Sequence, residues 1–182
     1  MRAFPLGQSI MPTTSIAACY GLIDTRFGCV AAWLDKHGAL LRLEFNIARE
    51  QERAHLKGTP RDDAALGEVA CQLQEYQDGS RREFTLALAP DGSAFQQRVW
   101  AELCRIPFGT TISYGELALR VGDPGPARAV GRANATNPIA LIVPCHRVIG
   151  SDGKLTGYAG GLPLKAALLE FEMRHTLPAL FQ

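Results

Sequence analysis

The sequence lacks the features of membrane, disulfide-rich and structural-zinc proteins. Its apolar runs, such as residues 139–143, are far shorter than the roughly 18 residues that a membrane span needs. The five cysteines form no CxxC pair, which indicates reduced thiols, and the four histidines are scattered, so we expect no structural zinc site. Residues 16–19 resemble a lipoprotein cleavage box, but the residues before them lack a continuous apolar core. We therefore expect a cytoplasmic protein.

The chain also lacks a net charge that would attract a partner as a whole. Nineteen basic and 18 acidic side chains leave a formal net charge of +1, and 47% hydrophobic residues are enough for a packed core. The charges are unevenly distributed, because residues 98–150 hold six basic side chains, all arginine, against three acidic ones. Any anionic partner is therefore expected to meet the second half of the chain.

The residue pattern predicts an α/β (α+β) protein with a mixed N-terminal domain and a mainly helical C-terminal one. We divide the chain into three parts: a flexible leader over residues 1–19, a structural domain over 20–90 and a functional domain over 91–182. Alternation and helical spacing predict the elements of the structural domain: strands in 20–35 and 40–45, a helix in 61–76 and a short strand in 84–89.

The C-terminal domain contains a candidate helix-turn-helix. A first helix begins at Ser93, and Ser113 with Glu116 three residues later forms the sequence of a reciprocal capping box at the start of the next. The stiff segment 123–126 predicts a short turn before another helix over 127–135. Two helices joined by such a turn are typical of DNA-binding proteins.

The second of these helices combines small side chains with arginines. Ala127, Gly131 and Asn134 share one stripe, and Arg128 and Arg132 lie on the neighbouring stripe. Small side chains let a helix backbone approach another surface closely, and the arginines indicate that this surface is a phosphate backbone. The alternative is an ordinary amphipathic helix with solvated arginines, because motifs of this length are weak.

A candidate reactive segment follows the helix-turn-helix. The apolar run 139–143, interpreted as a buried strand, leads directly into Cys145 and His146. A free thiol is only about 3% ionised at neutral pH, so a nucleophilic cysteine needs a base or a positive neighbour. Adjacent side chains on a strand point to opposite faces, so contact between the two requires a turn or a water. The alternative is a buried, unreactive cysteine.

The residues that follow favour a reactive site. Residues 157–161 form a glycine-rich loop with one tyrosine, whose backbone can approach a ligand closely. Glu172 lies at the border of the apolar face of the last predicted helix. Paired with His146, it would fix the imidazole tautomer, so that His146 takes a proton from Cys145 through water. The alternative is a surface Glu172 paired with Lys165 or with nothing.

Several long motifs, in this order, resemble the O6-alkylguanine-DNA alkyltransferases. The resemblance runs from about Ser93 to Glu172 and is carried by residues 127–131, 137–138, 144–148, 157–161 and Lys165. It implies a ribonuclease-H-like N-terminal domain and a C-terminal domain of winged-helix or helix-turn-helix type. It also implies direct-reversal DNA repair, in which Cys145 takes the alkyl (methyl) group of O6-alkylguanine once and irreversibly.

The resemblance further implies the roles of individual residues. The reaction would use Cys145 as nucleophile, His146 as base through water, Glu172 to orient His146, Asn137 to brace the active-site turn, and Tyr114 to rotate the nucleotide and donate a proton to the leaving guanine. DNA would be contacted by Arg128 as an intercalating finger, together with Ala127, Ala129, Gly131, Arg132 and Tyr114. The substrate pocket would be lined by Tyr158, Ala159, Gly160, Val148 and Arg147, the last of which would hold the loop by a structural ion pair.

The implied partner is double-stranded DNA containing O6-alkylguanine, contacted through the minor groove. We expect a monomer with no cofactor, no metal and no membrane partner. Ala159 stands where some relatives have a serine, and Ala140 where some have a proline. The range of alkyl groups accepted, repair of O4-alkylthymine and cooperative binding to DNA therefore stay open.

Three other functions fit parts of the pattern. A non-catalytic binder of alkylated DNA would keep Arg128 but would have no need of Cys145 beside His146. A helix-turn-helix transcription regulator would leave Tyr158 and the glycine-rich loop unexplained. A cysteine hydrolase would need an oxyanion motif, and the chain has no evident one.

Overall fold

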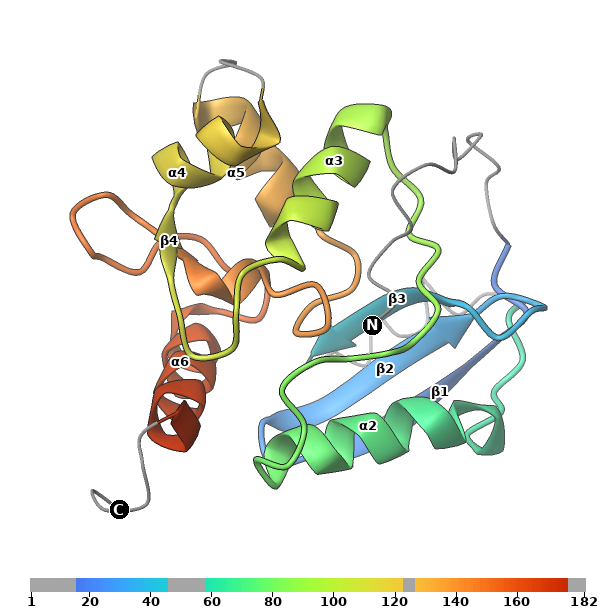
Figure 1. Ribbon diagram of the computed structural model, residues 1–182. Helices are drawn as coiled ribbons and strands as arrows, with labels where there is room; N and C mark the ends of the chain where they lie inside the picture. The colour runs from blue at the N-terminus through green and yellow to red at the C-terminus, as the bar shows by residue number, and fades with distance from the viewer. Residues whose placement is uncertain (1–15, 46–57, 123–126, 177–182) are drawn as a thin grey trace. The chain divides into compact units, whose positions relative to one another are not determined.

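The computed structural model describes residues 16–45, 58–122 and 127–176 (Figure 1). The chain divides into two compact units, Met1–Asp91 and Gly92–Gln182. The predicted leader falls largely on residues 1–15, which lie outside the described residues, and Cys19 already belongs to the first strand. Among the described residues, no helix is both long and apolar enough to cross a membrane.

The N-terminal unit is built on a three-stranded antiparallel sheet of order β1-β2-β3. Its strands are β1 (Cys19–Thr25), β2 (Gly28–Leu34) and β3 (Leu40–Phe45). A 3-10 turn (Ala64–Leu66) leads into α2 (Gly67–Gln77), which runs along the sheet (Figure 1). The strands predicted within residues 20–35 and 40–45 are thus confirmed, and β2 is buried throughout its second half.

Two predictions in this unit need correction. The helix predicted from residue 61 begins only at Ala64 as a 3-10 turn. The predicted strand 84–89 is wrong, because this segment makes only an isolated bridge between Leu88 and Leu40. The side chain of Gln72, rather than a ladder of strand hydrogen bonds, fixes the start of this segment. Gln72 Oε1 accepts from the backbone N–H of Thr85 at 2.9 Å, and Gln72 Nε2 donates to the Thr85 hydroxyl at 3.0 Å.

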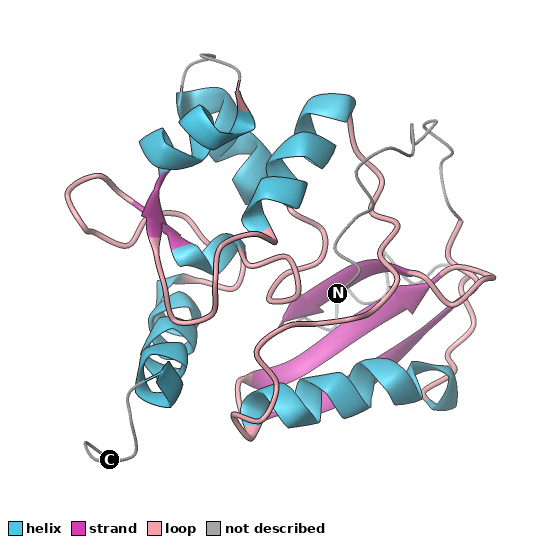
Figure 2. Ribbon diagram, viewed as in Figure 1, coloured by secondary structure: helices cyan, strands magenta, loops and turns pink. Residues whose placement is uncertain are grey.

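The C-terminal unit is mainly helical (Figure 2). Its elements in order are α3 (Ala94–Leu103), β4 (Ile112–Ser113), α4 (Tyr114–Val121), α5 (Ala127–Ala135), a 3-10 turn (Cys145–Arg147), β5 (Val148–Ile149) and α6 (Leu162–Thr176). The short strands β4 and β5 pair in parallel. The indole N–H of Trp100, fully buried on α3, donates to the carbonyl of Ala133 at 2.9 Å and so fixes α5 against α3.

Helix caps explain where these helices begin. A complete reciprocal capping box forms at Ser93, whose side chain accepts from the backbone of Gln96 while the Gln96 side chain accepts from the backbone of Ser93. The cap predicted at Ser113 is present, but the Glu116 carboxylate binds Arg120, one turn further on. The prediction of a reciprocal box there is therefore right only for its first half. The predicted turn 123–126 lies outside the described residues.

The strand predicted over residues 139–143 is wrong, and the segment is a buried turn. Leu141 has a φ of 71°, and the N–H of Val143 donates to the carbonyl of Ile139 at 3.0 Å. All five residues are buried, so the unbroken apolar run reflects burial from every side and says nothing about the backbone period. The turn brings the chain from α5 to Cys145 in a few residues.

Candidate active site

Cys145 begins a 3-10 turn directly after the buried segment. It is buried, with 6% of its surface exposed. Because a 3-10 turn does not alternate like a strand, neighbouring side chains need not point to opposite faces, and the sequence-based objection to a Cys145–His146 pair does not apply. Among the described residues, no direct hydrogen bond joins the two side chains, so a proton would have to pass between them through a water.

Asn137 fixes the backbone that precedes the cysteine. Its side-chain amide donates to the carbonyl of Val143 at 2.8 Å, and its carbonyl accepts from the N–H of Ile139 at 3.0 Å. Burial raises the pKa of the Cys145 thiol, and a hydrogen bond from Asn137 partly opposes this rise. The predicted bracing residue thus lies where it can hold both the turn and the sulfur.

Glu172 is completely buried and accepts hydrogen bonds at both carboxylate oxygens. Oε1 receives His146 Nε2 and Arg147 Nη2, each at 2.9 Å, and Oε2 receives Arg147 Nε at 2.9 Å and the backbone N–H of Gly109 at 3.0 Å. Burial raises the pKa of the Glu172 carboxyl, but the hydrogen bonds and charges of His146 and Arg147 outweigh it and lower this pKa to about 2. Glu172 is therefore an ionised acceptor at neutral pH.

This contact fixes the tautomer of His146. Burial lowers the pKa of the imidazole, so the ring is neutral and carries one proton. An ionised carboxylate can only accept, so that proton sits on Nε2 and Nδ1 holds a free lone pair. Nδ1 is buried and has no hydrogen-bond partner among the described residues. The structure thus brings together the predicted pair of Glu172 and His146, the residue that follows Cys145, and leaves the second imidazole nitrogen free to accept a proton.

Arg147 and Lys165 have partners that the sequence did not identify. Arg147 pairs with Glu172 through two nitrogens and donates from Nη1 to the carbonyl of Ile106 at 2.6 Å. Lys165 is fully buried and donates to the carbonyls of Val148 at 2.6 Å and Thr156 at 2.8 Å, so the alternative of a Lys165–Glu172 pair is wrong.

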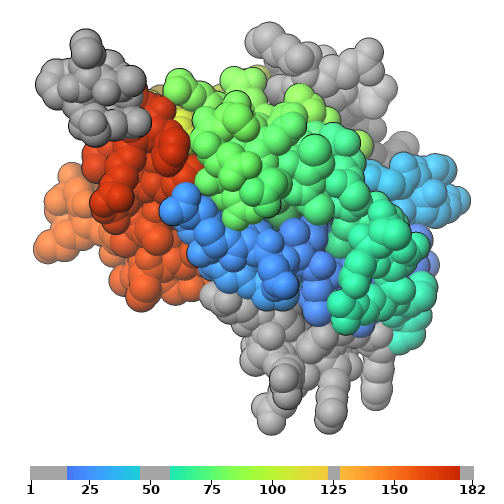
Figure 3. Space-filling view, turned by 90° about the horizontal axis from the view of Figure 1, so that it is seen from below, coloured from blue at the N-terminus to red at the C-terminus, as the bar shows by residue number. Residues whose placement is uncertain are grey.

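Lys165 joins α6 to the loop that carries Thr156. In the space-filling view, the segment around residue 150 (orange) lies beside α6 (red) (Figure 3). Burial lowers the pKa of Lys165, and its charge in turn opposes the rise in the pKa of Cys145. The burial of Lys165 could have been predicted from its position in the sequence, because it follows Leu164 and precedes Leu168 by one turn on the apolar face of the helix.

The glycine-rich loop contacts the site through Tyr158. The ring of Tyr158 meets that of His146 edge to face, with centroids 6.5 Å apart, and its hydroxyl is buried without a partner in the described part of the chain. A Cβ on Gly160 would stand 2.5 Å from the Leu164 side chain and 3.1 Å from the Tyr158 ring, so a larger residue there would require the Leu164 side chain to move. Ala159 is exposed, and Val148 is buried.

Two residues of the small stripe on α5, Gly131 and Asn134, lie beside Tyr114. A Cβ on Gly131 would lie 3.9 Å from the Tyr114 ring, and the Asn134 side chain, 3% exposed, reaches the Tyr114 hydroxyl. Asn134 therefore packs against Tyr114 of α4, whereas Gly131 remains half-exposed and open on its other side. The side chain of Ala127 lies outside the described residues.

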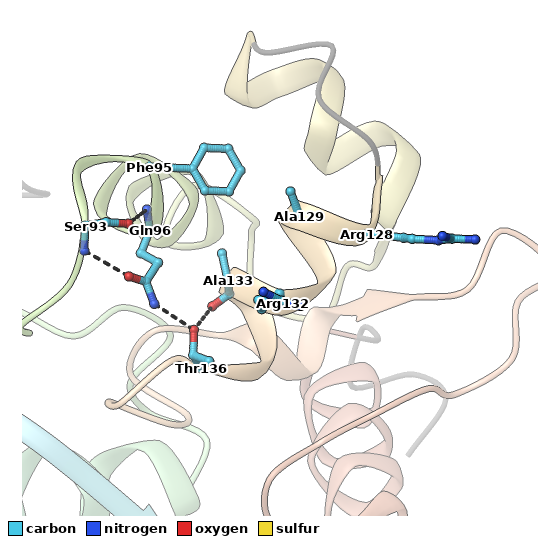
Figure 4. A pocket seen from close by; sticks show the side chains of 8 residues that line it. All are labelled: Ser93, Phe95, Gln96, Arg128, Ala129, Arg132, Ala133 and Thr136. Atoms are coloured by element: carbon cyan, nitrogen blue, oxygen red, sulfur yellow. Dashed lines mark hydrogen bonds between the residues drawn. The ribbon is translucent and has the colours of Figure 1, made fainter.

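Arg128 and Arg132 are exposed, and a groove of about 480 Å³ lies beside them between the start of α3 and α5 (Figure 4). Its lining is Ser93, Phe95, Gln96, Arg128, Ala129, Arg132, Ala133 and Thr136, with two arginines and no carboxylate. The Gln96 amide donates to the Thr136 hydroxyl, and this hydroxyl donates to the Ala133 carbonyl. Figure 4 shows Arg128 extending away from α5. This face suits an anionic ligand.

The described residues contain no group of three or more histidine, cysteine, aspartate or glutamate side chains that could hold a metal ion. The charged groups of the site, Glu172, Arg147 and Lys165, instead bind one another, His146 or the backbone. What the arrangement offers chemically is a buried thiol and, on the next residue, a neutral imidazole with a free nitrogen.

Comparison with known proteins gives one consistent result. A family model described as "6-O-methylguanine DNA methyltransferase, DNA binding domain" matches residues 94–174. A methylated-DNA–protein-cysteine methyltransferase of Mycobacterium bovis is 48% identical over 153 residues, which cover 84% of this chain and 91% of the relative. One from Methanosarcina barkeri is 57% identical over 105 residues, 58% of this chain and 66% of the relative.

Solved structures agree with the sequence comparison. A crystal structure of the Mycobacterium tuberculosis O6-methylguanine methyltransferase has a TM-score of 0.79 and 45% identity, covering 90% of this chain and 99% of its own. The M. tuberculosis protein in complex with DNA has a TM-score of 0.77 and 44% identity, with the same coverage. The mixed N-terminal and helical C-terminal architecture predicted from the sequence is thereby confirmed.

Proposed function

The chain belongs to the methylated-DNA–protein-cysteine methyltransferases and repairs DNA by direct reversal, and we propose that Cys145 takes the alkyl group from O6-alkylguanine. The observation that carries this proposal is the contact of Glu172 with His146, the residue after the cysteine, which leaves Nδ1 as a buried base with no partner in the described part of the chain. A nucleophile beside a base that a third group orients is the general arrangement for activating a weak nucleophile.

The path of the thiol proton follows from the protonation states of Cys145, His146 and Glu172. Cys145 rests as a thiol because burial raises its pKa, and His146 is neutral because burial lowers its pKa. A water between them passes the thiol proton to Nδ1, and ionised Glu172 stabilises the imidazolium that forms. The Asn137 hydrogen bond and the Lys165 charge stabilise the thiolate.

The transfer itself is a single displacement. The sulfur lone pair forms an S–C bond to the alkyl carbon as the bond from that carbon to O6 of the guanine breaks, and Tyr114 donates a proton to the leaving purine. The product is S-alkylcysteine and repaired guanine. A thioether is a poor leaving group, so each protein molecule acts once.

The guanine must leave the helix to reach a buried sulfur. Flipping a base costs a few kcal/mol, less where its pairing is already damaged. We assign Arg128 to the space that the flipped base leaves in the stack, because it extends from α5 into the open (Figure 4). The DNA duplex is contacted through its minor groove by α5, with Ala127, Ala129 and Gly131 near the backbone and Arg132 on a phosphate.

The flipped base lies in the pocket between Cys145 and the glycine-rich loop. Tyr158 and Val148 line this pocket, and Gly160 leaves room for the base. Because residue 159 is an alanine, only its backbone N–H can donate to O6. Arg147 takes no part in binding the base and holds the site through its pair with Glu172.

The remaining assignments concern the whole protein. We propose that residues 91–182 carry both DNA binding and catalysis, residues 20–90 support them, and the protein works as a monomer in the cytoplasm. The catalytic relay and both exposed arginines of α5 come from this one C-terminal unit, which supports a monomer.

Mass spectrometry tests the function directly. The protein is incubated with a duplex that contains one O6-methylguanine, and the peptide that contains Cys145 is weighed. We expect a stoichiometric gain of one methylene on this peptide, retained in the control variant Cys104→Ser and lost in Cys145→Ser. Tight binding without a gain in mass would instead identify a non-catalytic binder of damaged DNA.

A further inference from the structure

The side chain of Asn134 is a buried polar group that the proposed mechanism does not use. It lies on α5, one turn after Gly131, and is 3% exposed. Its Nδ2 donates to the Tyr114 hydroxyl at 3.4 Å, whereas its Oδ1 has no hydrogen-bond partner among the described residues. Burying an amide with half of its capacity unused costs free energy, so a role beyond packing is expected.

The contact sets the direction in which Tyr114 can donate. An amide NH₂ has no lone pair to offer, so the Tyr114 oxygen must be the acceptor in this bond. The hydroxyl proton of Tyr114 therefore points away from Asn134 and stays available to another group. The Tyr114 ring also lies beside Gly131, because a Cβ built on this glycine would be 3.9 Å from the ring, an ordinary van der Waals distance. The ring thus lies along α5 from Gly131 to Asn134.

We propose that Asn134 is a positioning residue that keeps the Tyr114 hydroxyl a proton donor toward the leaving purine. The inference rests on the proposed function, in which Tyr114 is the proton donor. A side chain that accepted at position 134 would capture the Tyr114 proton, and an apolar one would leave the hydroxyl free to turn.

The amide also acts during the transfer. As the S–C bond forms and the bond from the alkyl carbon to O6 breaks, the electron pair left on O6 spreads into the purine ring. A ring nitrogen then takes the Tyr114 proton, and the Tyr114 oxygen becomes a phenolate. Asn134 Nδ2–H donates to this oxygen, and a hydrogen bond to a charged group is about twice as strong as one between neutral groups. The phenolate recovers its proton from solvent.

A double-mutant cycle tests the proposal on the full-length protein. The rate of methyl transfer from duplex O6-methylguanine to Cys145 is measured under single-turnover conditions in wild type, Asn134→Leu, Tyr114→Phe and the double variant. We expect Asn134→Leu to slow the transfer by about 10- to 100-fold, as loss of a hydrogen bond to a developing charge implies. In the Tyr114→Phe background the same change should cost less than about threefold.

A second variant and two measurements separate positioning from folding. Asn134→Ser is too short to reach the Tyr114 hydroxyl and should reproduce the loss seen with Asn134→Leu. Thermal unfolding and duplex affinity of each variant report on the fold and on α5, and a positioning role predicts that the rate falls while the affinity for DNA changes little. Equal losses in the wild-type and Tyr114→Phe backgrounds, or no loss in either variant, would overturn the proposal.

The cycle also distinguishes failure of this inference from failure of the proposed function. If Tyr114→Phe alone leaves the rate unchanged, Tyr114 is not the proton donor and the role of Asn134 falls with it. Methyl transfer to Cys145, read from the mass of its peptide, would still stand in that case. If no methyl group reaches Cys145 in wild type, the proposed function itself is wrong.

Discussion

Replacing Glu172 by glutamine is predicted to destabilise the C-terminal unit strongly. A carboxylate has about four positions at which it can accept a hydrogen bond, and those of Glu172 receive His146, two nitrogens of Arg147 and the N–H of Gly109. A glutamine keeps one oxygen but turns an NH₂ group toward two of these donors. It also leaves the buried Arg147 guanidinium without a counter-charge.

Two independent arguments give a similar magnitude. Removing one partner of a buried ion pair costs about 3–5 kcal/mol, because the other charge stays buried and unpaired. The lowering of the Glu172 pKa from 4.5 to about 2 corresponds to about 3 kcal/mol of stability, since each pKa unit is worth about 1.4 kcal/mol. Because the pKa is lower in the folded state, this stabilisation is complete above about pH 4.5 and is lost as the pH falls toward 2.

Urea unfolding of a Trp33→Phe form measures the effect, because the chain has two tryptophans and Trp100 then reports on the C-terminal unit alone. We expect Glu172→Gln to lower the free energy of unfolding by about 3 kcal/mol at pH 7, and the difference from the parent to shrink as the pH falls below 4.5. Glu170→Gln is the matched control, since its exposed pair with Arg174 on the same helix is worth about 1 kcal/mol or less. A loss below 1 kcal/mol for Glu172→Gln, or a difference that does not vary with pH, would refute the reasoning.

Three further predictions concern the reaction. The transfer rate should stay level as the pH falls through 6.5, because burial lowers the pKa of His146, and a halving of the rate at 6.5 would show that this ring is solvated. Arg128→Ala should slow repair of duplex DNA far more than reaction with free O6-methylguanine base, which needs no flipping; Arg174→Ala serves as control, and equal losses on both substrates would exclude the finger role. Lys165→Met should raise the pKa of Cys145, measured as the pH dependence of its alkylation by iodoacetamide, and an unchanged pKa would show that the Lys165 charge does not reach the sulfur.

The local features of this fold could be predicted from the sequence. The starts of α3 and α4 were found because Ser93 and Ser113 cap helices through residues only three positions away. The strand-like pattern of residues 20–35 and 40–45 was found from alternation and short apolar runs, and these residues form β1, β2 and β3. The prediction of a strand over 139–143 was wrong because a stretch that is buried on every side shows no alternation of apolar and polar residues from which its backbone conformation could be recognised.

The long-range contacts of the site were only partly predictable. His146 and Glu172 could be paired because each needs what the other provides, a donor for a buried carboxylate and an anchor for an imidazole. For Arg147 an ion pair was expected but its partner was not identified, and for Lys165 the alternative of a pair with Glu172 was wrong. A cation can be satisfied by carboxylates or by backbone carbonyls, and the residue pattern does not distinguish the two. Lys165 in fact binds two carbonyls, of Val148 and Thr156, which no residue pattern marks.

Glu172 links the stability of the protein to its chemistry, and the two effects can be separated. In Glu172→Gln, a stabilising substitution elsewhere in the chain can compensate for the lost ion pair with Arg147 and restore the fold. It cannot restore the base, because the glutamine NH₂ can donate to His146 Nε2 and so favours the tautomer with its proton on Nδ1. The nitrogen that should receive the thiol proton would then be occupied. A restabilised Glu172→Gln protein should therefore be folded and slow, whereas a purely structural role for Glu172 would let the rate recover together with the fold.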